Sequence, residues 1–386
     1  MSFGILCAIV LAGLGGPLLG LSEKRFVPVV IGEIAAGVIV GKTGLEIVDP
    51  AKPTIAFLGE VGFAMLMLTV GMHLPLRDPR LAGALRGGTV LAALVGVLAV
   101  PAGFAAAAIA GTSHAAIYAV VLASGSAAVL LPALQETKAE GPDVLMVMAQ
   151  VTIADVVTIL SVPIVLQPQR TAHAVIGAAL VTVAVVALYG AARLLAGHRW
   201  VDHVRRMSKR RHWALDLRLS LLVLFGLAWI AQKSGTSALI AGFGAGVTVA
   251  LIGGPKRLST QMRGIADGFF IPLYFVILGA QLDLRGLVGD PAMLALTGAL
   301  AALNVTIHLA AVAIVRRPPS AGLTATAQLG VPAAVASLGL SEGVLSGTVA
   351  TAIVAAAVVS LGVCTIGVER LIDREGARAG PLAAKT

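Results

Sequence analysis

Long uninterrupted apolar segments, each of about 20 residues, are the feature that most restricts the fold of this chain. Such a segment is long enough to cross the hydrocarbon core of a bilayer as an α-helix. The composition agrees, since 58% of the 386 residues are hydrophobic and 12% are charged, against about 25% charged residues in soluble domains. Transmembrane β-strands would alternate polar and apolar residues, which these segments do not. We therefore predict an all-α polytopic membrane protein with almost no soluble part.

Hydrophobic windows, punctuated by Gly, Pro and charged residues, predict about thirteen transmembrane helices. The predicted spans are Phe3–Leu21, Val27–Ile47, Thr54–Leu74, Gly87–Gly111, Ala115–Gln135, Val144–Leu166, Ala174–Gly197, Ala214–Gln232, Thr236–Ile252, Gly268–Leu282, Pro291–Val315, Ala321–Leu340 and Val344–Leu371. The first span lacks the basic start and the cleavage site of a signal peptide, so we expect it to be retained.

Basic residues are divided unevenly between the loops. If the N-terminus lies outside, 23 of the 28 Lys and Arg residues lie inside, and the five outside are Lys42, Lys52, Arg170, Lys233 and Arg285. This distribution follows the positive-inside rule. It predicts a multi-pass protein of the inner or plasma membrane with a cytoplasmic C-terminus. It also accounts for the net charge of +9 without nucleic acid as a partner.

The longest inside connection, His198–Arg218, is strongly basic and contains Trp200 and Trp213. It could be an amphipathic strip that binds anionic lipid headgroups. It could also be an ordinary cytoplasmic linker, which the charge rule alone explains and which we favour from the sequence.

A sequence repeat indicates the architecture. Gly71–Arg77 and Gly279–Arg285 both read G-x-x-L-x-L-R, 208 residues apart. Seven predicted helices separate the copies, so they enter the membrane in opposite directions, as in the inverted repeats of secondary transporters. We predict two inverted six-helix repeats within a transmembrane domain at 1–372. The repeats lie at about 3–166 and 214–371, with a linker helix at about 174–197 and a short cytoplasmic tail at 373–386.

Two corresponding spans contain residues that can interrupt a helix. One has Ser124, Gly125 and Ser126 at its middle, and the other has Gly330-Val331-Pro332. Discontinuous helices expose backbone groups at membrane depth, which is tolerated where they line a site. The alternative, a simple kink or close helix packing, is equally consistent with the local sequence.

Asp155 is the single ionisable residue between Val144 and Leu166. A carboxylate at the middle of a span is costly and usually marks an ion or proton path. Its ionised form is a hard oxygen ligand for a cation, so a proton and a cation would compete for it. The alternative is a carboxylate neutralised by a nearby Lys or Arg. We expect Asp155, with Thr152 and the Ser124–Ser126 segment, to bind the cation or proton, and Gln150 to line the pathway.

Other polar residues in the spans are weaker candidates. Glu33 and Glu60 could line a pathway or face a helix contact. Asn304 and His308 are one turn apart on one helix face, where they could support the site or simply bond to a neighbouring helix. The sequence contains no nucleophile triad, phosphate loop or zinc pattern, so we expect neither an enzyme nor a cofactor.

Several segments resemble the second monovalent cation/proton antiporter family, the Kef-like members of the sodium/proton exchanger superfamily. They are Pro28–Gly41 (PVVIGEIAAGVIVG), Leu58–Gly62 with Gly71-Met72, and Phe269–Pro272 with Gly279 and Leu282-Asp283. The resemblance implies a homodimer. It also implies that helices four to six and eleven to thirteen form a moving core, in which helices five and twelve cross as broken helices beside Asp155.

The chain also departs from the family pattern. Ala154 precedes Asp155 where relatives carry a second polar group, and Gln328-Leu329-Gly330-Val331 replaces a common R-G-E pattern. The family's basic residue in helix eleven is replaced by Asn304 or by His308. These losses favour electroneutral exchange of one Na⁺ or K⁺ for one proton by alternating access. A gated cation channel, or a sensor that keeps the fold without transporting, are the alternatives.

Overall fold

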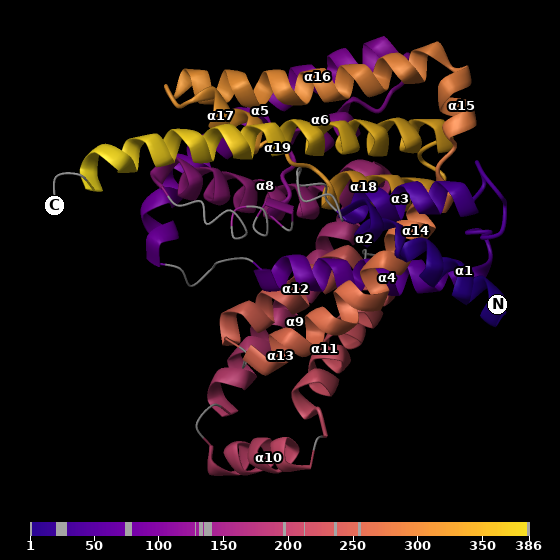
Figure 1. Ribbon diagram of the computed structural model, residues 1–386. Helices are drawn as coiled ribbons and strands as arrows, with labels where there is room; N and C mark the ends of the chain where they lie inside the picture. Colours follow the sequence, from indigo (N-terminus) through magenta and orange to yellow (C-terminus); the bar gives the residue numbers. More distant parts are fainter. Residues whose placement is uncertain are drawn as a thin grey trace. The chain divides into compact units, whose positions relative to one another are not determined.

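The computed structural model describes residues 2–20, 29–73, 79–127, 129–130, 134, 141–195, 198–211, 213–234, 238–253 and 256–383. Every regular element in these ranges is a helix (Figure 1). Eight of the described helices are long and apolar enough to cross a membrane, and four shorter apolar helices accompany them. The predicted all-α polytopic membrane fold is therefore confirmed, while the number of thirteen spans stays a prediction.

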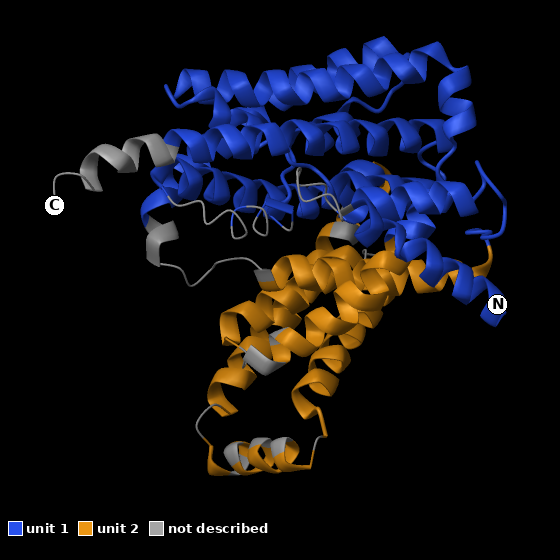
Figure 2. Ribbon diagram, in the orientation of Figure 1, with its two compact units in different colours: residues 1–51, 78–166, 275–386 blue, residues 52–77, 167–274 orange. Residues whose placement is uncertain are grey.

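The chain forms two compact units, each assembled from segments far apart in the sequence (Figure 2). Unit 1 contains α1 Phe3–Gly13, α2 Gly15–Gly20, α3 Val29–Val40, α5 Pro79–Ala110, α6 Ala115–Ala123, α8 Pro142–Leu166, α15 Leu284–Gly289, α16 Pro291–Ile314, α17 Pro319–Thr324, α18 Gly330–Ser341 and α19 Gly347–Ala383. Unit 2 contains α4 Pro53–His73, the 3₁₀-helix η1 Pro168–Arg170, α9 Thr171–Leu195, α10 Arg199–Arg210, α11 Leu215–Lys233, α12 Ala238–Ile252, α13 Lys256–Ile265 and the π-helical η2 Ala266–Phe270. Helix α14, Ile271–Gln281, begins in unit 2 and continues into unit 1.

The first predicted span, Phe3–Leu21, does not form a single helix, because it divides into α1 and α2. Close packing of α2 on α3 accompanies the division. A methyl group added at Gly15 would lie 3.0 Å from the carbonyl oxygen of Gly32 and 2.9 Å from Cβ of Ala36. Hydrophobicity predicts that this segment is apolar, but it does not predict the interruption at Leu14.

The second predicted span, Val27–Ile47, is too long, since α3 ends at Val40. The residues that follow form hydrogen bonds with the end of α14 instead of continuing the helix. Lys42 N donates to the carbonyl oxygen of Ala280 at 3.1 Å, and Thr43 Oγ1 donates to that of Leu282 at 2.7 Å. These bonds to a distant segment end the helix before the apolar sequence ends.

Helices also form where connections or a tail were expected. α10 occupies the basic connection His198–Arg218, and α15 begins at a cap in which the Asp283 side chain accepts from Gly286 N at 2.8 Å. α19 continues past Leu371 to Ala383, through most of the predicted tail. Hydrophobic windows detect apolar spans only, so polar helices of this kind are not found by them.

Two glycine contacts, one in each unit, join pairs of these helices. In unit 1 a methyl group added at Gly279 of α14 would lie 3.0 Å from Cα of Gly37 on α3. In unit 2 a methyl group added at Gly71 of α4 would lie 3.0 Å from Cα of Gly246 on α12. Small residues of this kind allow helix backbones to approach closely in membranes.

The Gly246→Val variant is expected to unfold at a lower temperature than the wild type. A methyl group at this position would collide with backbone atoms of α4, and overpacking of this kind costs about 1–3 kcal/mol. Thermal unfolding of the purified protein in detergent measures the effect. Gly226→Val on α11 is the matched control, because no described atom lies within 4 Å of its added methyl group. Equal effects of the two substitutions would contradict the packing argument.

Candidate functional site

The fifth predicted span is discontinuous, as Ser124-Gly125-Ser126 indicated. Helix α6 ends at Ala123, and residues 124–126 are not helical. Ser124 Oγ donates to the carbonyl oxygen of Val121 at 2.7 Å, which satisfies one carbonyl at the end of α6. Gly125 packs on α8, where an added methyl group would lie 2.8 Å from Cγ1 of Val151. The second half of the predicted span extends to Gln135 and lies largely outside the described residues.

Asp155 lies on α8 beside this break. Its side chain is 2% exposed, and its Oδ2 accepts from the backbone N–H of Ala127 at 2.9 Å. Backbone N–H groups at the start of a helical segment lack intrahelical acceptors and favour a negative charge. The break therefore presents a donor to Asp155, the single ionisable residue of the predicted span Val144–Leu166. Thr152, three residues earlier and also buried, shares this face of α8.

The twelfth predicted span is also discontinuous. Helix α17 ends at Thr324 and α18 begins at Gly330, so the interruption, residues 325–329, precedes the Gly-Val-Pro segment on which the prediction rested. Sequence reasoning located the broken span correctly and the break itself a few residues late, because Pro332 is tolerated within the first turn of α18.

A pair of side-chain amides connects the two breaks. Asn304 of α16 is fully buried, and its Nδ2 donates to the carbonyl oxygen of Thr326 at 3.0 Å and to Ser360 Oγ of α19 at 2.9 Å. Gln328 Nε2 donates to Asn304 Oδ1 at 2.8 Å and to the carbonyl oxygen of Leu122, near the end of α6, at 3.2 Å. Two neutral amides thus satisfy backbone carbonyls in both broken helices.

His308 lies one turn beyond Asn304 but makes a different contact. It is 2% exposed, and its Nδ1 lies 2.9 Å from the carbonyl oxygen of Asn304 in its own helix. Among the described contacts, Asn304 reaches the breaks and His308 does not. Gln328 was noted in the sequence as a departure from the family pattern but was not selected as a site residue. A glutamine in an apolar span gives no indication of its partners.

The three candidate pathway residues do not all lie in the same unit. Gln150 on α8 is 2% exposed, and its Oε1 has no hydrogen-bond partner among the described residues. Glu33 on α3 is 3% exposed and lies against Gly16 of α2 in unit 1. Glu60 is an exposed residue of α4 in unit 2. The expected pathway roles of Gln150, Glu33 and Glu60 stay predictions.

An ion pair fixes the start of α8. Arg317 Nη1 lies 3.0 Å from Asp143 Oδ1, and the Asp143 side chain is 1% exposed while that of Arg317 is 45% exposed. Arg317 belongs to the short connection between α16 and α17, so the pair ties the helix that carries Asp155 to the beginning of the second broken helix. Asp143 lies in the first turn of α8, where a carboxylate also interacts favourably with the helix dipole.

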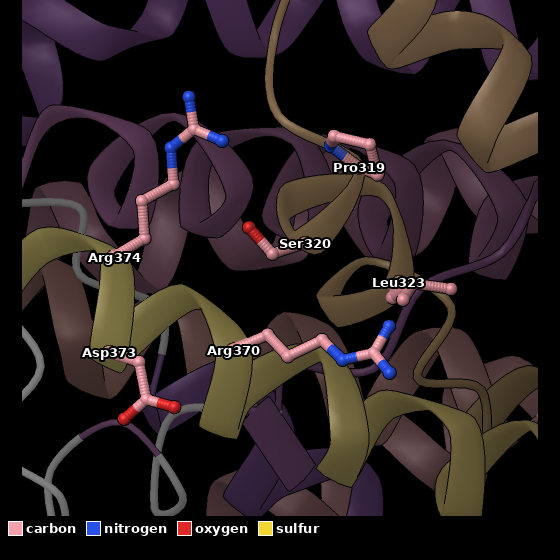
Figure 3. A pocket seen from close by; sticks show the side chains of 6 residues that line it. All are labelled: Pro319, Ser320, Leu323, Arg370, Asp373 and Arg374. Atoms are coloured by element: carbon pink, nitrogen blue, oxygen red, sulfur yellow. The ribbon is translucent and has the colours of Figure 1, made fainter.

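A pocket of about 490 Å³ lies beside the start of α17 (Figure 3). Its lining residues are Pro319, Ser320, Leu323, Arg370, Asp373 and Arg374. None of the predicted site residues belongs to this lining. The described residues also contain no group of three or more His, Cys, Asp or Glu side chains that could hold a metal ion.

The site thus combines two broken helices, a buried carboxylate at one break and amides that bond to both breaks. Discontinuous membrane helices of this kind are typical of secondary transporters. The chain belongs to the sodium/hydrogen exchanger family, whose transmembrane region matches residues 7–374. This is a family of transporters. The match confirms the resemblance drawn from the sequence motifs.

Individual relatives agree with the family match. GerN of Bacillus cereus, named a Na⁺/H⁺-K⁺ antiporter, is 22% identical over an alignment of 377 positions that covers 92% of each chain. YjbQ of Bacillus subtilis, named a putative Na⁺/H⁺ antiporter, is 25% identical over an alignment of 316 positions that covers 76% of this chain and 50% of YjbQ, so the match spans half the length of that relative. The sodium proton antiporter MjNhaP1 from Methanocaldococcus jannaschii has the same fold, with a TM-score of 0.60 at 18% identity over 99% of this chain and 98% of that one.

Proposed function

We propose that this protein is a secondary antiporter that exchanges Na⁺ or K⁺ for protons, with Asp155 as the carboxylate that binds proton and cation in turn. The observation that carries the proposal is the buried Asp155 carboxylate, hydrogen-bonded to Ala127 N at the break of a membrane helix. The similarity to GerN and MjNhaP1, which are both named as cation/proton antiporters, supports the same function.

One carboxylate suffices for coupled exchange. An ionised carboxylate in hydrocarbon surroundings needs a compensating positive charge, which a proton or a small cation supplies. If only the loaded, neutral site changes its access from one side to the other, each cation carried one way requires a proton carried the other way. Neutral oxygen atoms, which suit an alkali cation, are available on Ser124 and Ser126 in the break that donates to Asp155, and on Thr152, one turn before Asp155 on α8.

Exchange of one cation for one proton follows from the charges around the breaks. Asn304 and Gln328, whose side chains bond to each other between the two breaks, are neutral amides and cannot release a second proton. Ala154, on the amino side of Asp155, cannot titrate either. We therefore propose electroneutral exchange, with a rate that does not respond to membrane potential.

Alternating access would follow from the inverted repeats. The glycine contact between Gly37 and Gly279 in unit 1 has a counterpart between Gly246 and Gly71 in unit 2. Gly246 is 209 residues after Gly37, and Gly279 is 208 residues after Gly71, close to the offset of the sequence repeat. Each repeat thus contributes one helix to each pair, as two-fold pseudo-symmetry requires.

The rest of the proposal concerns assembly and placement. We propose a homodimer in the inner or plasma membrane, with the N-terminus outside and the C-terminus in the cytoplasm, because this orientation leaves most basic residues inside. The substrates are the cation and protons, and no cofactor, catalytic residue or nucleic acid is needed for this activity.

Reconstituted vesicles test the function and identify the ion. Purified protein is placed in acid-loaded vesicles with an internal pH dye, and Na⁺, K⁺ or Li⁺ is added outside. We expect one or more of these ions to cause alkalinisation at a rate that is unchanged when a K⁺ or proton ionophore sets the membrane potential. Cation flux without proton movement would indicate a channel. Cation binding without either flux, in folded and inserted protein, would indicate a sensor.

A further inference from the structure

The basic helix α10 connects two membrane-spanning helices of unit 2 by very short links. α9 ends at Leu195 and α10 begins at Arg199, while α10 ends at Arg210 and α11 begins at Leu215. At about 3.5 Å per residue, these links reach no further than about 14 Å and 18 Å. Figure 1 shows α10 lying across the ends of α9 and α11. Since α9 and α11 are long and apolar enough to span a membrane, α10 is held at the level of the membrane surface.

The two faces of α10 differ in chemistry. Arg199, His203, Arg206 and Arg210 are spaced by four, three and four residues, so they form one stripe along the helix, and all four are exposed. The side that includes Ser208 faces the beginning of α11, because Ser208 Oγ accepts from Leu215 N at 3.2 Å. Next to it, Val201, Val204 and Met207 are half-buried. This is the pattern of a basic amphipathic helix that lies in a membrane interface.

Arginine–aromatic pairs mark the interface at both ends of α10. On α9 the guanidinium carbon of Arg193 lies 6.0 Å from the ring centroid of Tyr189. Before α11 the guanidinium carbon of Arg211 lies 5.6 Å from the ring centroid of Trp213, which is 39% exposed. Tyr and Trp concentrate at the headgroup level of membrane proteins, and an arginine stacked on a ring keeps its N–H edges available for phosphate.

We infer that α10, together with the Arg193–Tyr189 and Arg211–Trp213 pairs, forms a binding surface for the anionic phospholipid headgroups of the adjacent leaflet. Residues 199–211 contain six Arg or Lys and one acidic residue, so the surface is complementary to phosphate-bearing headgroups. The short links keep these arginines near the membrane surface, and the attraction of an anionic surface acts over a Debye length of about 8–10 Å. The inference does not depend on the transport activity.

Fluorescence of Trp213 tests this inference directly. The full-length protein with Trp200→Phe and Trp229→Phe keeps Trp213 as its single tryptophan. It is reconstituted in vesicles of about two thirds phosphatidylcholine and one third phosphatidylglycerol. Two preparations are compared, one with brominated phosphatidylglycerol and one with brominated phosphatidylcholine. Quenching by brominated phosphatidylglycerol should exceed its share of the lipid, and added salt should reduce the excess. No quenching, or quenching in proportion to the lipid mixture, would overturn the inference.

Matched variants distinguish lipid binding at this surface from a general effect of the protein's positive charge. Arg206→Gln with Arg210→Gln should reduce the excess quenching by about half or more, whereas the Lys substitutions at both positions should preserve it. Arg370→Gln with Arg374→Gln removes the same number of exposed charges from α19 and should leave it unchanged. Equal loss in both double variants would contradict the inference. Loss of the excess on adding inorganic phosphate, at constant ionic strength, would indicate a site for free phosphate instead.

Discussion

The Asp155→Asn variant is expected to fold and insert normally and to show no cation-dependent proton movement. Its side-chain oxygen can still accept from Ala127 N, so the contact at the break is kept. The neutral amide can neither take up a proton nor compensate a cation. Loss of a buried charge removes a desolvation penalty of about several kcal/mol, so the melting temperature should be unchanged or higher. The pH-dye assay in vesicles and thermal unfolding of the purified protein measure the two effects.

Asp373→Asn provides the matched control, because it also removes one carboxylate but from an exposed position on α19. It should transport like the wild type. A binding measurement adds a second readout. Na⁺ or K⁺ should raise the melting temperature of the wild type, more at high pH because fewer protons compete, and should have no effect on Asp155→Asn. Residual exchange above about a tenth of the wild-type rate would contradict the role given to Asp155.

The sequence predicts the individual residues of this site better than the contacts between them. Asp155 is recognisable because a lone carboxylate in an apolar span has few structural explanations. The first break is recognisable because Ser124, Gly125 and Ser126 are poor helix formers at the middle of a span. Both signals are local, so one residue and its immediate neighbours are enough to detect them.

Contacts between distant segments leave no comparable signal. Gln328 interacts with Leu122 and Asn304, and nothing in the sequence around these residues pairs them. The end of α3 depends in the same way on bonds from Lys42 and Thr43 to the end of α14. The spacing of Asn304 and His308 could not show which of them supports the site, because both lie on one helix face. They differ in their contacts, since Asn304 bonds to other helices and His308 to a carbonyl of its own helix.

The amide pair predicts a clear order of effects among three substitutions. Asn304→Leu removes hydrogen bonds to Thr326, Ser360 and Gln328, and it leaves the buried Thr326 carbonyl and Gln328 amide without these partners. An unsatisfied buried polar group costs about 1–3 kcal/mol. We therefore expect Asn304→Leu to lower the free energy of unfolding by several such increments and to reduce exchange strongly. Thermal unfolding and the pH-dye assay measure both.

Gln328→Leu should have an intermediate effect and His308→Leu the smallest. Gln328→Leu leaves two acceptors unpaired, the Leu122 carbonyl and Asn304 Oδ1, whereas His308 contacts a carbonyl of its own helix. A double-mutant cycle with Asn304→Ala and Gln328→Ala should give a coupling energy of about 0.5–3 kcal/mol, because the two amides bond directly. The same cycle with Asn304→Ala and a distant substitution, Gly226→Ala, should give a coupling near zero. If His308→Leu were the most damaging of the three, the hydrogen bonds of Asn304 would not be what holds the two breaks together.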